Sequence, residues 1–201
     1  MKKIIAVLFM IAPYISMAQL QELNGGVGVR FGLPIDSIKY VMQQKHADAK
    51  FNDKIGTTIF YEGGKFAGRN VIMWVFKTSK VTGVHTIIIH LNNEESEVYN
   101  SFDSMTELMD KKYGEHTSIE NYQWPYTADD KYKYGSTMFR AGKASLQNIW
   151  SFQGSNFDNR DIKNYIAVEI NDKFSIEVTY QDGARVNKAV ELKNNANMSD
   201  L

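Results

Sequence analysis

The spacing of hydrophobic and polar positions changes several times along the chain. Between residues 57 and 91, β-branched and aromatic residues dominate and glycines separate the runs, which predicts strands over about 57–62, 69–77 and 84–91. In the second run both sets of alternating positions are apolar, so this strand is predicted to be central or to present one face to a partner. The two sets are Val71, Met73 and Val75, and Ile72, Trp74 and Phe76.

Two segments have helical spacing instead. The first is predicted over 37–46, with Asp36 as its N-cap and a buried stripe that contains Ile38 and Met42. The second opens after the polar residues 92–96, and its apolar positions recur from Val98 to Met109. Lysines in the last turn and a glycine at 114 mark its end.

The C-terminal half has weaker signals. Residues 115–143 are irregular and rich in aromatic side chains, and they are predicted to form a long loop with at most one short strand. Strands follow over 146–152, 165–170 and 174–180, and the last two are joined by a tight hairpin at Asn171–Asp172. The segment 183–201 reads as a polar tail that is partly helical, between 184 and 192.

This order of elements predicts the fold class. A helix followed by three strands occurs twice, which indicates an α+β fold, with an antiparallel sheet covered by two helices on one face. The order α-β-β-β-α-β-β-β also raises the hypothesis of a degenerate internal repeat. We expect one α+β domain over residues 19–182.

Residues 1–18 are predicted to be a secretory signal peptide rather than part of the fold. Lys2 and Lys3 precede an apolar run, and Ser16-Met17-Ala18 supplies small residues before a cleavage point at Gln19. The alternative is a membrane anchor, but the apolar run is shorter than the roughly 20 residues that span a bilayer. The mature protein is therefore expected to be periplasmic or secreted, without stable membrane insertion.

The composition of the chain limits the kinds of partner that we expect. The chain has 201 residues, 43% hydrophobic residues, no cysteine, and 23 basic against 23 acidic side chains. Balanced charge gives no electrostatic footprint for phosphate backbones, so nucleic acid is not an expected partner. A cysteine-free exported chain is typical of a bacterial envelope protein whose core alone holds the fold, and it lacks the cysteine that lipid anchoring needs.

Several short segments resemble a known group of proteins. They are the start that ends in Ala18-Gln19, the segment Phe31-Gly32-Leu33-Pro34-Ile35-Asp36, the helix end Lys111-Lys112-Tyr113-Gly114, and the final Ser199-Asp200-Leu201. Together they resemble small secreted proteins of gut Bacteroidetes. The layout also resembles the β-lactamase-inhibitor-protein-like fold and the small outer-membrane-assembly lipoprotein domain. The resemblance implies a fold and a compartment, and it carries no catalytic residue.

Motifs for catalysis, metals and cofactors are weak. His85 and His90 are five residues apart on one strand, so they are predicted to point to opposite faces. No serine lies in the Gly-x-Ser-x-Gly motif of a hydrolase nucleophile. The glycines around Gly26 and Gly28 are interpreted as loop residues rather than as a phosphate-binding loop. The oxygen-rich segment 156–161 lacks the glycine and glutamate of a calcium loop. We expect no metal, no cofactor and no enzyme activity.

The aromatic residues carry the functional prediction. Core packing is the ordinary explanation for Trp74 and Phe76, whereas Tyr122, Trp124 and Tyr126 lie in the predicted loop and are harder to bury. All five are candidate binding residues. The first hypothesis is an exported binding module that engages a protein through this loop and the uncovered sheet face. The alternatives are a carbohydrate-binding module, for which a groove with tyrosine or tryptophan beside carboxamides and carboxylates is expected, and a hydrolase that uses Asp or Glu pairs.

Overall fold

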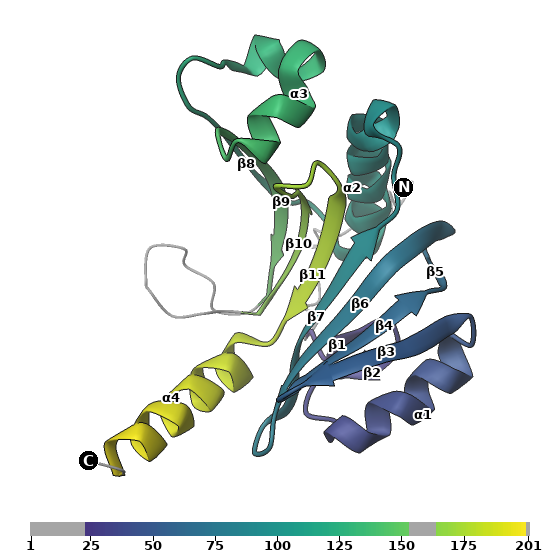
Figure 1. Cartoon of the computed structure of the whole chain (residues 1–201), viewed down its shortest axis with the longest axis vertical. Coiled ribbons are helices and arrows are strands. Elements are labelled where there is room, and N and C mark those ends of the chain that lie inside the picture. Colours follow the sequence, from purple (N-terminus) through teal and green to yellow (C-terminus); the bar gives the residue numbers. More distant parts are fainter. Residues whose placement is uncertain (1–22, 153–163, 200–201) are drawn as a thin grey trace, which may run out of the picture.

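The computed structural model describes residues 23–152 and 164–199 of the chain (Figure 1). The predicted signal peptide and the segment 156–161 lie outside these residues. The helices are α1 (Ile35–Lys45), η1 (Glu95–Glu97), α2 (Val98–Tyr113), η2 (Ala128–Asp130), α3 (Lys131–Arg140) and α4 (Gly183–Ser199). The strands are β1 (Gly25–Gly26), β2 (Val29–Arg30), β3 (Ala49–Ile55), β4 (Thr58–Gly63), β5 (Lys65–Phe66), β6 (Arg69–Ser79), β7 (Gly83–Leu91), β8 (Thr117–Tyr122), β9 (Ala144–Ser151), β10 (Tyr165–Ile170) and β11 (Ile176–Gln181).

The predicted α+β class is confirmed. Strands β3 to β11 form one nine-stranded antiparallel sheet with the order β3-β4-β6-β7-β11-β10-β9-β8, and β5 is attached to β6. The chain builds this sheet in two halves, each with a helix followed by four strands of the sheet: α1 precedes β3, β4, β6 and β7, and α2 precedes β8, β9, β10 and β11. Strand β5 is inserted in the first half, and η2 and α3 are inserted in the second. Each half therefore contains a fourth strand beyond the three predicted, and the halves meet where β7 pairs with β11.

Both helices cover the same face of the sheet. Strand register places Trp74, Ile89, Val178, Val168 and Asn148 in one row across the sheet. At one end of this row the Trp74 ring contacts His46, which follows α1, and at the other Asn148 is hydrogen-bonded to Thr106 of α2. The core of the molecule lies between this face and the two helices.

The first helix begins earlier than its cap residue predicted. It spans Ile35–Lys45, with Pro34 at the N-cap and no side-chain capping bond, so Asp36 lies in the first turn rather than at the cap. Proline fixes an extended residue before the helix, and the acid in the first turn still complements the helix dipole. Ile38 and Met42 are buried as predicted.

The prediction of a long loop over 115–143 was wrong, although the short strand that it allowed is present as β8. This segment contains β8 at the sheet edge, η2 and α3. A capping box between Thr127 and Asp130 starts η2, and α3 buries Met138 and Phe139. The Phe139 ring packs against Phe174 in the turn before β11, so α3 closes one end of the sheet.

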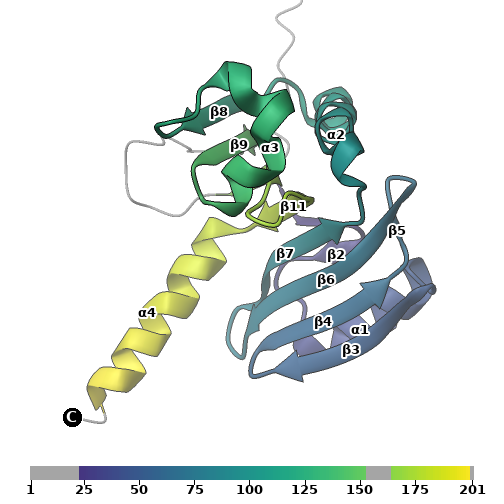
Figure 2. The same ribbon diagram turned by 45° about the horizontal axis from the view of Figure 1, so that its top comes forward.

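The last helix stands apart from the sheet. Figures 1 and 2 show α4 extending from the end of β11 away from the rest of the molecule. It is longer than the stretch 184–192 that the sequence predicted. Its first turn is fixed by Arg185, which pairs with Asp182 and donates to the Thr82 carbonyl. Within the described residues, no helix combines the length and the apolar character that crossing a bilayer requires.

Candidate functional site

A groove opens between α2, β8, β9 and α3, near the end of the sheet that α3 closes. Its volume is about 330 Å³, and it runs over the part of the sheet face that α2 leaves open beside the edge strand β8. We call it the tyrosine groove. It is lined by Tyr99, Phe102, Asp103, Thr106, Glu107, His116, Ser118, Glu120, Lys131, Tyr132, Leu146 and Asn148.

Local structure explains why these side chains converge. On α2, Tyr99, Asp103 and Thr106 lie on one face because they are separated by four and three residues. On β8, Ser118 and Glu120 alternate onto the same side of the strand. Ser118 is paired directly with Asn148 of β9, which places the amide of Asn148 at the floor of the groove.

Asn148 is a buried polar residue with an unsatisfied atom. Its side chain is only 4% exposed, and its Nδ2 donates a hydrogen bond of 2.9 Å to Thr106 Oγ1. Its Oδ1 has no hydrogen-bond partner among the described residues. Leaving a buried acceptor unpaired costs about 1–3 kcal/mol, so this position is poorly explained by packing alone.

Two tyrosines, Tyr99 and Tyr132, line the groove, and a third, Tyr122, contacts the lining residue Glu120. The Tyr99 hydroxyl donates to the Lys131 carbonyl at 3.0 Å, and its ring lies edge-on to Tyr132, with 5.5 Å between centroids. Burial, together with nearby Tyr122, Tyr132 and Glu120, raises the pKa of Tyr99 to about 12, so this hydroxyl stays protonated at neutral pH. Burial and Glu120 likewise raise the pKa of Tyr122, whose hydroxyl lies 3.4 Å from Glu120 Oε2. Tyr132 is 77% exposed and presents its ring to solvent.

The polar groups of the groove are mostly acceptors. Asp103, Glu107 and Glu120 bring carboxylates, whereas Lys131 is the one lysine or arginine among the lining residues. Ionised carboxylates only accept hydrogen bonds. His116 is already held, because its Nδ1 lies 2.9 Å from Asp110 Oδ1. The groove therefore suits a ligand with many donor groups and a flat apolar face.

None of the three predicted loop aromatics lines this groove, and Tyr122 is the one that contacts a lining residue, Glu120. Tyr122 ends β8, two residues after the groove residue Glu120, and the following turn is held by the Gln123 amide donating to the Lys143 carbonyl at 2.8 Å. Trp124 is 88% exposed at this turn. Tyr126 is half-buried, with its ring 6.1 Å from that of Tyr134.

The other two predicted binding residues require a correction. Trp74 and Phe76 are fully buried in the helix-covered core, and the Trp74 indole donates to the Gly63 carbonyl at 2.8 Å. Trp74 and Phe76 lie on the interior strand β6 and belong to the hydrophobic core, whereas Ile72, which lies at the register shift between Val71 and Met73, is exposed. Neither residue is able to contact a partner in this fold.

A pair of carboxyl groups lies on the opposite face of the sheet. Glu169 of β10 is directly paired with Glu177 of β11, and Gln147 and His90 flank them on the neighbouring strands. The Gln147 amide donates to Glu169 at 2.8 Å, and His90 Nδ1 lies 3.2 Å from Glu177. Burial and the neighbouring Glu177 raise the pKa of Glu169 to about 7. Burial lowers the pKa of His90, against the attraction of Glu177.

The part of the chain that the structure describes contains no cluster of side chains able to bind a metal ion. Within residues 23–152 and 164–199, no three His, Asp or Glu side chains are grouped as ligands for an ion. The four histidines are dispersed. His46 contacts the Val27 carbonyl, and His85 is hydrogen-bonded to Thr86.

Sequence reasoning missed most of the groove. Tyr99 and Asn148 carry no local motif, and they line one groove only because α2 packs over β10 and β11 and reaches β9 through Thr106. One signal was available: Thr127-x-x-Asp130 matches a capping box, which would have predicted the start of a helical segment and placed Tyr132 on it.

Comparison with known proteins adds no relative: no family model, no curated protein and no solved structure matches this chain. The resemblance to the β-lactamase-inhibitor-protein-like fold and to secreted Bacteroidetes proteins therefore stays a prediction. The function has to be argued from the site.

Proposed function

We propose that this protein is an exported, non-catalytic binding module that holds a saccharide in the tyrosine groove. The observation that carries the proposal is the buried Asn148 carboxamide with a free Oδ1, set between carboxylates and tyrosine rings. A sugar ring offers hydroxyl donors to such acceptors and an apolar face to an aromatic ring. Export is the expectation from residues 1–18.

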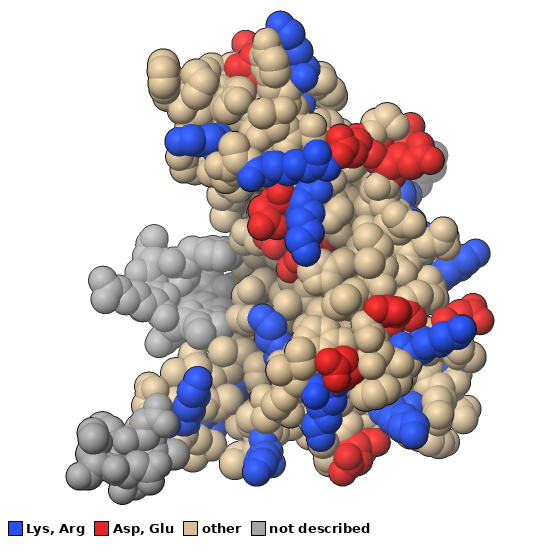
Figure 3. Space-filling view, in the orientation of Figure 1, with Lys and Arg blue, Asp and Glu red and all other residues tan. Residues whose placement is uncertain are grey.

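The shape of the site favours a glycan over a wide protein interface. A protein hot spot is expected on a broad, shallow apolar patch, whereas the groove is a cleft of about 330 Å³ with polar walls. Charge agrees with this choice, because Lys and Arg are interspersed with Asp and Glu over the face in Figure 3, without a large region of one sign. The groove itself carries three carboxylates and one lysine, so a neutral or amino-bearing saccharide suits it better than an acidic one.

We infer binding rather than hydrolysis from the position of Glu169, the one carboxyl group with a raised pKa among the described residues, and of its neighbour Glu177. Glycoside hydrolysis needs two carboxyl groups separated by roughly 5–10 Å, with the sugar between them. Glu169 and Glu177 are directly paired on neighbouring strands and lie on the sheet face opposite the groove. Catalysis by this pair would leave the groove without a role.

The test is a binding titration of the full chain against a panel of neutral and amino-sugar oligosaccharides, followed by tryptophan and tyrosine fluorescence. Tyr132→Ala is expected to weaken binding of any active saccharide at least tenfold, because it removes the exposed stacking surface. Asn148→Leu is expected to abolish binding while the fold persists, since an apolar side chain of similar size replaces the unpaired amide.

Tyr40→Ala is the matched control. Tyr40 is 67% exposed on α1, remote from the groove in the sequence and in the fold, so its removal should leave saccharide affinity unchanged. Equal losses in the two tyrosine variants, or no binding across the panel, would overturn the proposal.

A second candidate, a protein partner, is favoured by the 88% exposure of Trp124. Buried tryptophans at interfaces are typical anchors, and truncation of an anchor removes at least about 2 kcal/mol of binding. A pull-down from envelope extract with wild type and Trp124→Ala tests this candidate. A named protein that is captured by the wild type and lost with Trp124→Ala supports it, and equal capture by both excludes Trp124 as the anchor.

A further inference from the structure

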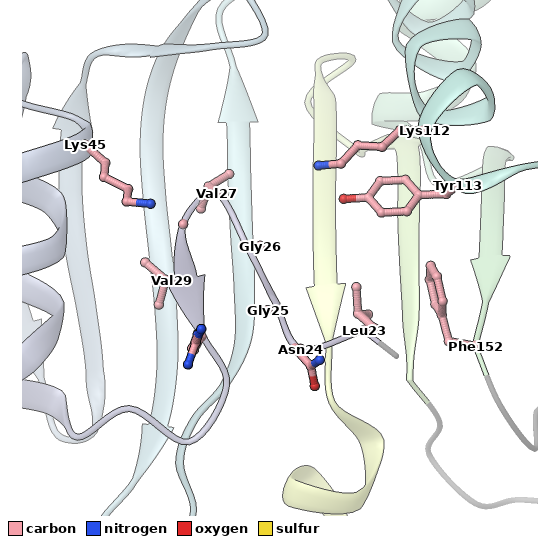
Figure 4. Close-up of a pocket in the computed structure, with 12 residues that line it drawn as sticks. Leu23, Asn24, Gly25, Gly26, Val27, Val29, Lys45, Lys112, Tyr113 and Phe152 are labelled. Carbon is pink, nitrogen blue, oxygen red and sulfur yellow. The ribbon is translucent and has the colours of Figure 1, made fainter. Parts of the chain in front are cut away.

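A second cavity lies at the middle of the helix-covered face, where the ends of α1 and α2 approach the β1–β2 hairpin. Its volume is about 350 Å³ (Figure 4). We call it the hairpin pocket. It is lined by the hairpin residues 25–30, by Leu23 and Asn24 before them, by Lys45, by Lys112 and Tyr113, and by Phe152. None of these residues belongs to the tyrosine groove.

Equivalent positions of the two halves supply its charge. Lys45 is in the last turn of α1 and Lys112 is in the last turn of α2. Figure 4 shows the two side chains entering from opposite sides, with both ammonium groups directed toward the space between the helices. Arg30 of β2 is the third cation of the lining, which contains no aspartate or glutamate.

These cations lack acidic partners. Among the described residues, none of Arg30, Lys45 and Lys112 forms an ion pair, although Arg140, Arg185 and Lys188 do. Lys112 makes a cation–π contact instead, with its ammonium 4.8 Å from the centre of the Tyr113 ring. Because the whole chain is electrically balanced, three unpaired cations around one cavity form a local excess of positive charge.

The ordinary explanation for lysine near a helix end is attraction to the last carbonyls. The contacts of Lys45 go beyond this. Its stem lies so close to the hairpin that a Cβ on Gly28 would stand 2.4 Å from Lys45 Cδ. Gly28 therefore leaves room for the lysine stem along the hairpin backbone, which directs the ammonium to the pocket rather than back to the helix.

The hairpin itself is held in a costly conformation. Its tip residues Val27 and Gly28 both have positive φ, 51° and 82°, and a β-branched residue rarely adopts the left-handed region. His46 Nε2 fixes this tip through the Val27 carbonyl at 2.9 Å. Such strain persists where the surroundings impose it, and it is concentrated at functional sites.

The remaining wall is apolar. Leu23, Val29 and Phe152 are buried hydrophobic residues, and the Phe152 ring packs edge-on against Tyr113 at 5.8 Å between centroids. Burial, and after it the neighbouring Tyr113, holds the pKa of Tyr180 well above its usual value. A cationic opening over an apolar wall matches an anionic head group attached to a short apolar body.

We propose that the hairpin pocket binds a small organic oxyanion, a carboxylate or phosphate with a short apolar body, between Lys45 and Lys112. This site is separate from the tyrosine groove, and it gives a role to the glycines around Gly26 and Gly28. They form a hairpin that shapes the pocket, without the strand-turn-helix context of a nucleotide-binding loop.

The test is calorimetric titration of the full chain with three probes: hexanoate, inorganic phosphate and hexanol. Hexanoate is expected to bind tightest, because it uses both the cations and the apolar wall. Lys45→Gln and Lys112→Gln should each weaken hexanoate binding about tenfold, since each removes one charge-assisted contact. The double variant should lose more, and added salt should weaken binding by the wild type.

Lys111→Gln is the matched control, because it removes the same charge one residue from Lys112 without touching the pocket lining. It should leave hexanoate affinity nearly unchanged. Equal losses in Lys111→Gln and Lys112→Gln would show a general charge effect and overturn the proposal. Binding of hexanol as tightly as hexanoate, or no binding of any anion, would also overturn it. Tyr132→Ala should bind hexanoate normally, which separates this result from the fate of the saccharide proposal.

Discussion

Glu169 and Glu177 stand directly opposite each other on β10 and β11, on the sheet face opposite the tyrosine groove. Glu169 has the raised pKa, about 7, because burial and the negative charge of Glu177 both disfavour its ionised form. The folded state therefore holds a proton that the unfolded chain loses near pH 4.5.

This proton makes stability depend on pH. Between about pH 4.5 and 7 the native state binds more protons than the unfolded state, so the contribution of Glu169 to stability falls as pH rises through this window. Glu169→Gln should remove that loss and raise the free energy of unfolding at pH 8 by about 1–2 kcal/mol, after screening by solvent. Urea unfolding at pH 5 and pH 8 measures it, with exposed Glu94→Gln as control. If the change in unfolding free energy between pH 5 and pH 8 is the same in Glu169→Gln as in the wild type, the assignment is contradicted. Titration of His90 does not affect this comparison, because His90 is present in both proteins.

Substitution of an exposed residue at the start of the second helical segment should cost little stability, whereas substitution of a buried residue on α2 should cost much more. Phe102 is buried beneath α2, so Phe102→Ala should cost about 3–5 kcal/mol through the cavity it leaves. Glu95 is exposed in η1, and its ion pair with Arg140 lies in water, so Glu95→Ala should cost less than about 1 kcal/mol. Denaturant melts of both variants provide the comparison, and equal losses would show that the helix face is misassigned.

Alanine substitution of the buried Trp74 should destabilise the fold strongly, whereas the same substitution of the exposed Trp124 should not. Trp74→Ala empties a fully buried site and breaks the bond to the Gly63 carbonyl, so a loss of at least about 3 kcal/mol is expected. Trp124→Ala removes an exposed side chain and should change stability by no more than about 0.5 kcal/mol. Thermal melts of the pair decide the matter, and strong destabilisation by Trp124→Ala would return that residue to the core.

The signal peptide is expected to be absent from the mature protein. The pattern of residues 1–18 predicts cleavage before Gln19, so the intact mass of protein recovered from its native cell should correspond to a chain that begins there. Envelope material that retains Met1 would refute the signal peptide.

The sequence predicted best the elements whose apolar positions form a strong pattern along the whole segment. β6 and β7 are interior strands with nearly continuous apolar runs, and α2 combines an apolar stripe with lysines and a glycine at its end. β3 has no such signal, because it lies at a sheet edge and all but one of its residues are exposed. Period-2 alternation is absent where neither face is buried.

The candidate site could be predicted only in part for a related reason. Trp124 and Tyr122 were accessible to reasoning because loop aromatics are unusual, whereas Asn148 became informative only when its burial was known. Its partner Thr106 is 42 residues away in the chain. The same applies to Lys45 and Lys112, which meet because the two halves are arranged symmetrically about the β7–β11 pair.

The pairing of β7 with β11 also constrains how the protein is made. β7 ends at residue 91 and its neighbour begins at 176, so a growing chain carries the hydrogen-bonding edge of β7 unpaired while about 85 further residues are added. Strand edges of this kind recruit other strands, and closing so distant a contact slows folding. Any chain shortened before residue 176 keeps its most apolar edge open, and it should form aggregates through β7 rather than fold as half a sheet.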